Sequence, residues 1–138
     1  MIHYRNDVRR SGVDGRALQR AARQLLAATG TGAALSLWLV GDETMRALNR
    51  EHRGKDRATD VLSFRIGGEI LGDVVISVDT AKRQAVEYGA PLQREVERLL
   101  IHGILHLLGH DHVRAGERKR MLAEERRLAQ RIGMPWPY

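Results

Sequence analysis

The sequence predicts a single α+β domain, in which a small mixed sheet of about four strands carries helices packed on it. Two observations predict this fold class. Apolar or alternating runs of strand length recur along the chain, and segments with apolar residues three or four apart lie between them. In addition, no repeat, low-complexity tract or linker divides the 138 residues. A chain of this length buries a core without cross-links, so we expect one domain over residues 1–138.

The N-terminal half begins with alternating residues that predict a short edge strand at residues 2–4. Apolar residues at helical spacing then predict a helix over residues 13–28, with Asp14 as its N-cap. The apolar run at residues 34–40 is typical of a central or half-buried strand. After a turn, we expect Asp42 to cap a short helix.

A strongly polar segment, residues 50–60, is expected to be a loop, and long loops on compact domains are often functional. Residues 61–66 and 71–78 follow as strands, and the two glycines between them predict a tight turn and an antiparallel pair. Asp79 is the expected cap of the next helix, residues 80–88.

A long apolar helix is expected to begin at Pro91, and its end carries the most informative residues of the chain. His102 and His106 are four residues apart, so on a helix both imidazoles lie on one face and can reach one cation. Gly109 is placed to end the helix in a left-handed conformation, which could bring His112 back as a third ligand. Three histidines leave one position of a tetrahedral zinc open, as in catalytic sites. The sequence therefore predicts a metal site at the end of a central helix.

Two neighbouring residues leave alternatives open. His110 lies four residues after His106, so a continuous helix would make these two a second pair. If the helix stops at Gly109, His112 is the better third ligand and His110 becomes a neighbour that contacts substrate. Asp111 either orients a ligand imidazole or is a solvent-facing turn residue.

Charged residues around this helix have simpler interpretations. Glu95 shares the face of the histidines, but a surface ion pair with Arg98 or Arg94 is favoured over a role in the site. The last predicted helix, residues 114–132, is rich in arginine and lysine, and a solvated face is favoured over contact with phosphate.

Composition restricts the function classes. The formal charge of +6 and the pI near 10.5 favour an anionic partner, nucleic acid being the commonest. Aromatic residues make up only 4%, which disfavours an extended platform for stacked bases. There is no cysteine, no apolar run of membrane-spanning length and no signal-peptide pattern, so we expect a cytoplasmic protein with no membrane partner.

Several blocks, found in order over about residues 35–115, resemble the YbeY family. The blocks are LNREHRGKDRATDVLSF (48–64), LGDVVIS (71–77), QAVEYG (84–89) and HGILHLLGHDH (102–112). His110 is a departure, because many members have an aromatic residue such as tyrosine there.

The resemblance implies a zinc-dependent, single-strand-specific endoribonuclease that acts in ribosomal RNA maturation, at the 3′ end of the small-subunit (16S) RNA, and in ribosome quality control. It places the ligands of one zinc ion per chain on His102, His106 and His112. It also places the family's functional arginine on Arg53, so we predict Arg53 and His102 as catalytic residues. Implied partners are single-stranded and ribosomal RNA, together with proteins of the small ribosomal subunit; the oligomeric state is not predicted.

Two other functions compete with this one. Zinc could instead stabilise a non-catalytic factor that docks on the ribosome during assembly. A zinc peptidase is the weaker rival, because Gly103 stands where the peptidase motif His-Glu-x-x-His has its general base.

Overall fold

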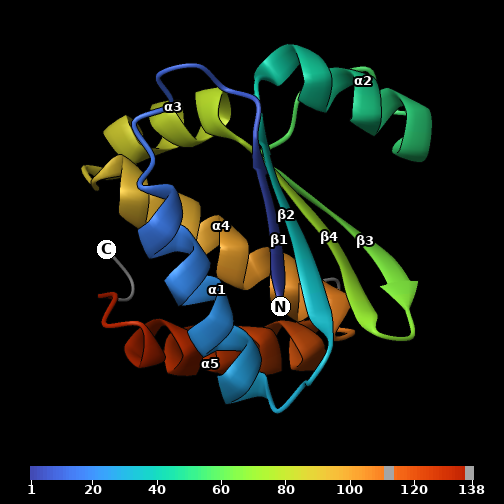
Figure 1. Cartoon of the computed structure of the whole chain (residues 1–138), viewed down its shortest axis with the longest axis vertical. Helices are drawn as coiled ribbons and strands as arrows, with labels where there is room; N and C mark the ends of the chain where they lie inside the picture. Colours follow the sequence, from blue (N-terminus) through green and yellow to red (C-terminus); the bar gives the residue numbers. More distant parts are fainter. Residues whose placement is uncertain (111–113, 136–138) are drawn as a thin grey trace.

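The structure is a computed structural model that describes residues 1–110 and 114–135 (Figure 1). Within these ranges the elements, in chain order, are β1 (Ile2–Asn6), α1 (Gly15–Thr29), β2 (Ala34–Val40), α2 (Asp42–Arg53), β3 (Val61–Gly67), β4 (Ile70–Ser77), α3 (Val78–Tyr88), α4 (Leu92–Leu107) and α5 (Ala115–Arg131). None of the helices in this part of the chain is long and apolar enough to cross a membrane.

The four strands form one mixed sheet with the order β1-β2-β4-β3. β2 is parallel to both β1 and β4, whereas β3 and β4 form the antiparallel hairpin that the two glycines predicted. β1 and β3 therefore lie at the two edges of the sheet (Figure 1). The predicted fold class is confirmed.

Alternating residues of the strands divide the core into two layers. Leu35, Leu37 and Leu39 of β2 are fully buried in the larger layer, which also contains buried residues of α1, α4 and α5. The opposite face of the sheet carries a smaller cluster around Met45 of α2. Figure 1 shows the same division, with α1, α4 and α5 on one side of the sheet and α2 on the other. A strand that is apolar on both faces is expected at the centre of such a sheet.

α2 is longer than its sequence pattern predicted. The helix continues through Arg53, so the segment that was predicted as a loop over residues 50–60 is helical in its first four residues. Gly54 ends the helix with φ of 68°, and its N–H donates to the carbonyl of Arg50 at 3.1 Å. Basic residues in the last turn complement the negative end of the helix dipole, which favours this extension. Arg53 is therefore carried by a helix rather than by a loop.

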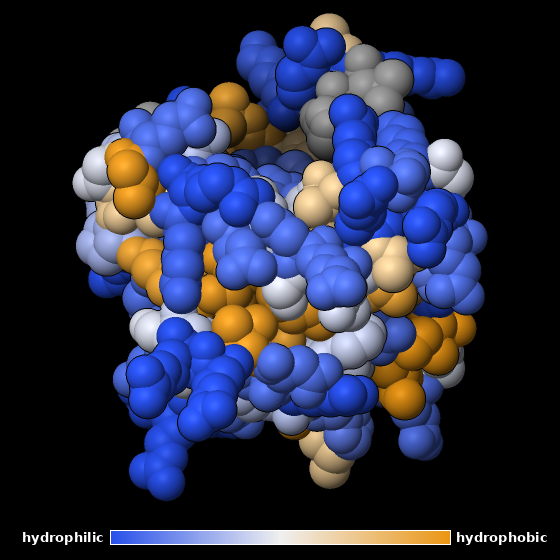
Figure 2. Space-filling model, turned by 90° about the horizontal axis from the view of Figure 1, so that it is seen from above, coloured by the Kyte–Doolittle hydropathy of each residue, from blue (hydrophilic) through white to orange (hydrophobic). Residues whose placement is uncertain are grey.

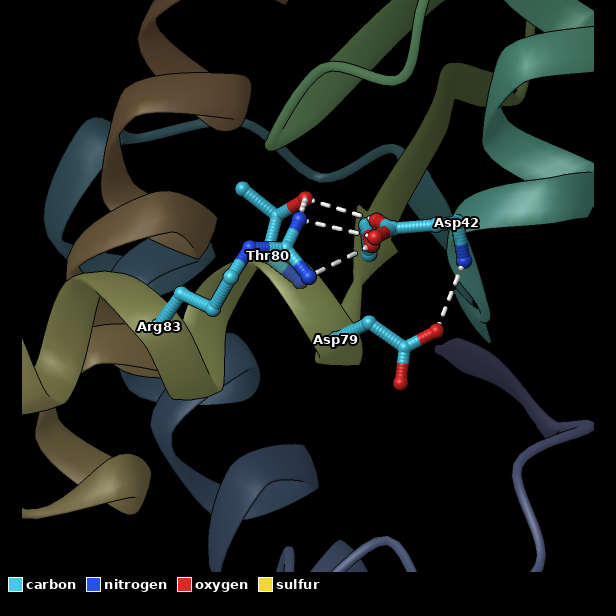
Figure 3. A network of polar contacts seen from close by, with 5 residues as sticks. Asp42, Asp79, Thr80 and Arg83 are labelled. Atoms are coloured by element: carbon cyan, nitrogen blue, oxygen red, sulfur yellow. Dashed lines mark hydrogen bonds and ion pairs between the residues drawn. The ribbon is translucent and has the colours of Figure 1, made fainter.

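Hydrogen bonds join the N-termini of α2 and α3, and they show that both predicted caps were wrong (Figure 3). The Asp79 carboxylate accepts a hydrogen bond of 2.8 Å from the backbone N–H of Asp42. In return, Asp42 accepts bonds of 2.6 and 2.7 Å from the hydroxyls of Ser77 and Thr80, and one of 2.7 Å from Arg83. Ser77 is the N-cap of α3, and no side chain caps α2 at Gly41. This reciprocal arrangement was not visible in the sequence because the two residues are 37 positions apart.

α4 lies unusually close to the sheet at Gly103. A Cβ atom at this position would lie 2.7 Å from Cγ1 of Val74 and 3.2 Å from Oγ of Ser63. The residue that follows His102 is therefore a point of close contact between α4 and the strands β3 and β4. A glutamate at this position would be directed into the sheet rather than into the site.

Candidate active site

His102 and His106 form a converging pair near the end of α4. Their Nε2 atoms are 3.0 Å apart, and their ring centroids are 4.5 Å apart at an interplanar angle of 75°. Both side chains are half-buried. The predicted placement of the two imidazoles on one helical face is confirmed.

The end of α4 has the geometry that Gly109 predicted. The helix ends at Leu107, and Gly109 has φ of 95°. The N–H of Gly109 donates to the carbonyl of His106, and the N–H of His110 donates to that of Leu105, both at 3.0 Å. These two bonds form a Schellman motif. Because the helix does not continue, His106 and His110 are not one helical turn apart, which removes the second pair.

The donor set fits zinc as far as the structure describes it. Two nitrogen ligands about 2.0–2.1 Å from a tetrahedral zinc are roughly 3.3 Å apart, close to the separation of the histidine pair. In residues 1–110 and 114–135, no group of three His, Cys, Asp or Glu side chains converges on one point. The predicted third ligand, His112, and its neighbour Asp111 lie outside the described residues. The ligand set therefore stays a prediction.

A carboxylate of α5 faces the outer nitrogen of His102. Oε1 of Glu125 lies 3.8 Å from Nδ1 of His102, and the Glu125 side chain is largely buried. Carboxylates beside the second ring nitrogen fix the orientation of ligand histidines in metal sites. Glu125 is thus placed to direct Nε2 of His102 towards the shared position.

The histidine pair opens into a groove of about 750 Å³, which we call the active-site groove. One wall is the C-terminal part of α4, and the other is β3 with the segment that precedes it. The lining residues are Arg53, Lys55, Thr59, Asp60, Val61, Ser63, Arg65, His102, His106, Leu107, Gly109 and His110. His110 and Arg53 therefore lie in the same groove as the histidine pair. Their roles as a substrate-contacting neighbour and a functional arginine stay predictions.

The charge of the groove is predominantly positive. Within the described ranges, no carboxylate lies within ion-pair distance of Arg53, Lys55 or Arg65. The one acidic lining residue is Asp60, whose carboxylate accepts bonds from its neighbour's backbone and from Gln84. An anionic ligand fits this groove.

The end of the molecule formed by α2 and α3 is covered mainly by hydrophilic residues, with smaller apolar areas between them (Figure 2).

Comparison with known proteins assigns the family. The family model described as endoribonuclease YbeY matches residues 3–133, which is nearly the whole chain. The chain belongs to the YbeY family. A curated endoribonuclease YbeY of Myxococcus xanthus is 55% identical over 112 residues, which are 75% of this chain and 38% of the relative. The chain thus spans well under half of that relative's length. An endoribonuclease YbeY of Pelotomaculum thermopropionicum is 49% identical over 129 residues and matches 85% of each chain.

A solved structure supports the YbeY fold. The solution structure of TM1509 from Thermotoga maritima aligns with a TM-score of 0.69 at 25% sequence identity. The alignment covers 96% of this chain and 89% of the other. The chain thus shares its overall fold with an experimental structure over nearly its whole length.

Glu95 departs from its prediction within the YbeY core. It pairs with Arg98 through bonds of 2.7 and 2.8 Å, as expected, but its side chain is fully buried rather than at the surface. Nε2 of Gln84 lies 3.3 Å from carboxylate oxygens of both Glu95 and Asp60, so it links the buried pair to the wall of the groove. Glu95 does not line the groove, and it is connected to the groove wall only through Gln84 and Asp60 among the bonds described above.

Sequence analysis missed two residues of this YbeY site. Glu125 lies on the last helix, whose charged residues were expected to be solvated, and Arg65 lies near the end of the strand predicted at residues 61–66. Glu125 has no local signal, because it meets α4 only through tertiary packing. For Arg65 the alternation of β3 was a usable signal, since residues two apart on a strand share a face and Val61, Ser63 and Arg65 all line the groove.

Proposed function

We propose that this protein is a zinc-dependent endoribonuclease that cleaves single-stranded RNA, acting in maturation of the 3′ end of small-subunit ribosomal RNA and in ribosome quality control. The observation that carries the proposal is the converging histidine pair inside a groove with three cations. Family membership supports RNA as the substrate, because the relatives are named endoribonucleases. The groove has the volume of a small-ligand pocket, which suits a short stretch of one strand.

The histidines would hold the metal. His102 and His106 supply two converging nitrogens, and His112 is the proposed third ligand. When bound, zinc supplies Lewis-acid polarisation of a phosphoryl oxygen and makes water a stronger acid. Three protein ligands leave room for a substrate or water.

Arg53 would bind the phosphate that is cleaved. Its guanidinium is exposed and has no carboxylate within ion-pair distance in the part of the chain that the structure describes. The planar guanidinium of an arginine can bond two phosphate oxygens at once. Its charge offsets the negative charge that develops on the phosphate during cleavage.

Two routes to cleavage are compatible with this groove. Either water or the ribose 2′-hydroxyl attacks the phosphorus. Attack by the 2′-hydroxyl leaves a cyclic phosphate, whereas attack by water does not. Mass spectrometry of the product ends distinguishes the two routes.

The rival functions predict different results. A peptidase is not supported, because the general-base position of its motif is Gly103, which faces the sheet. The docking factor is the stronger alternative, and substitution of Arg53 separates it from a nuclease. We compare Arg53→Ala with Arg23→Ala, which removes the same charge from exposed α1, outside the residues that line the groove.

A nuclease would lose most of its turnover in Arg53→Ala, keep it in Arg23→Ala, and retain the same zinc content and unfolding free energy in both. Removing a group that stabilises transition-state charge typically costs about 10²–10³-fold in kcat. Equal cleavage by both variants would contradict the role of Arg53. RNA binding without cleavage by the parent would favour the docking factor. Cleavage of an RNA that carries the 3′ end of the small-subunit RNA, compared with cleavage of an unrelated single-stranded RNA, tests the proposed role in ribosomal RNA maturation.

A further inference from the structure

Arg65 stands at the opposite end of the active-site groove from Arg53. Smaller cavities adjoin the groove, and two of them share its arginines. One, of about 200 Å³, shares Arg53, Lys55, Thr59 and Val61 with it. The other, of about 490 Å³, shares Arg65, Leu107 and Gly109 with it and leads to the β3–β4 turn. The groove is therefore the middle of a longer track that continues in two directions.

Contacts between β3 and α4 place the histidines between these two ends. Oγ of Ser63 donates a bond of 2.9 Å to the carbonyl of Gly103, next to His102. Two residues further along β3, a guanidinium nitrogen of Arg65 lies 3.5 Å from the carbonyl of His106. Val61 lies at the Arg53 end, about 13 Å from Arg65 along an extended strand. Along the groove the order is thus Arg53, the histidine pair and then Arg65.

The guanidinium of Arg65 is available to a ligand. The side chain is exposed, and its bond to the His106 carbonyl is long, at the limit of hydrogen-bond geometry. The same nitrogen lies 3.3 Å from where a Cβ of Gly109 would be, so it borders the groove beside the end of α4. The backbone carbonyls at the C-terminal end of α4 attract the Arg65 guanidinium and keep it near the groove. They carry only partial negative charge and so do not neutralise it.

We propose that Arg65 is a second phosphate-binding residue, which holds the RNA backbone on the far side of the histidine pair from Arg53. The RNA strand passes through the groove and is held on each side of the bond that is cleaved, which suits cleavage within an RNA chain. This inference rests on the proposed function, since the ligand is the same RNA. It adds a contact that the family resemblance does not assign.

The test compares Arg65→Gln with Arg23→Gln in the zinc-loaded protein. Glutamine removes the charge and, because its side chain is shorter, also the long bond to the His106 carbonyl, so the zinc and stability measurements report any role of that bond. Fluorescence anisotropy of a labelled single-stranded RNA at several salt concentrations reports binding, and a gel of each sample reports cleavage. Zinc content and urea unfolding are measured for every protein.

Arg65→Gln should weaken RNA binding about tenfold, the loss expected for one charge-assisted contact. It should also lower the slope of log affinity against log salt by about 0.7, the value for one phosphate contact on a single strand. Arg23→Gln should change neither quantity as much, and zinc content and stability should be unchanged in both.

Three results would overturn the inference. Equal binding and equal salt slopes in the two variants would show that Arg65 does not contact phosphate. Loss of stability or zinc in Arg65→Gln would show that the residue serves the end of α4. A parent that does not bind RNA would remove this inference and the proposed function together. A parent that binds RNA without cutting it, with the expected change in Arg65→Gln, would support Arg65 and refute only the nuclease.

Discussion

The hydroxyl of Ser63 on β3 donates a hydrogen bond of 2.9 Å to the carbonyl of Gly103, the residue that follows His102 on α4. The bond fixes the height of the helix above the sheet, and glycine permits the close approach. The position of the histidine pair thus depends on a contact between an edge strand and a helix, not on the helix alone.

Substitution of Gly103 by alanine should destabilise the protein and disturb the site. The added methyl group would meet Val74, a stiff β-branched side chain, so we expect a loss of about 1–3 kcal/mol, as for overpacked cores. Urea unfolding measures this loss of stability. The affinity for zinc should fall as well. Gly116→Ala is the control, because Gly116 lies in α5 with open space around its Cβ position, and alanine there should be neutral or stabilising. Equal stabilities of the two variants would contradict the close-contact account.

Glu125→Gln should weaken zinc binding about 10- to 100-fold without unfolding the protein. The carboxylate faces Nδ1 of His102, and loss of such partners has this effect in other metal sites. Competition with a chromophoric chelator measures the affinity. Glu87→Gln removes an exposed carboxylate of α3 and should leave zinc binding unchanged. If both variants bind zinc like the parent, Glu125 does not orient the ligand.

Arg98→Ala should cost about 3–5 kcal/mol of unfolding free energy, because it leaves the buried Glu95 carboxylate without its main partner. Arg46→Ala breaks an ion pair of similar length, with Asp56, that is about half exposed. Surface pairs contribute about 0–1 kcal/mol, so this control should change little. Similar losses of unfolding free energy in the two variants would mean that burial of an ion pair does not determine how much stability is lost when it is broken.

Asp42 should make stability depend on pH. Burial alone would raise the pKa of this carboxyl, but hydrogen bonds from Ser77, Thr80 and Arg83 together lower the pKa below its ordinary value of 3.8. A lowered carboxyl pKa stabilises the fold above the unfolded-state value, and the contribution is lost as the pH falls through the folded-state pKa. Asp42→Asn should therefore cost about 1–3 kcal/mol at pH 7.

Urea unfolding of the parent and Asp42→Asn at decreasing pH tests this prediction. The difference between the two should shrink once the pH falls below 3.8. A difference that stays constant down to acid unfolding would show that charge on Asp42 is not what the network stabilises.

Sequence reasoning predicted what local patterns determine. The sheet, the caps at Asp14 and Gly109, and the one-face placement of the histidines follow from periodicity and from residues within a few positions of each other. It failed where distant segments meet. The bond between Asp42 and Asp79, the burial of Glu95, and the placement of Glu125 and Arg65 beside α4 all depend on how elements pack.

The most direct test of the account is cleavage of a labelled single-stranded RNA by the zinc-loaded protein, beside His106→Ala purified in the same way. The account predicts cleavage by the parent and none above background by the variant, which loses one of the two converging nitrogens. Matched purification controls for contaminating ribonuclease. Equal cleavage by both proteins would contradict phosphodiester chemistry at the histidine pair.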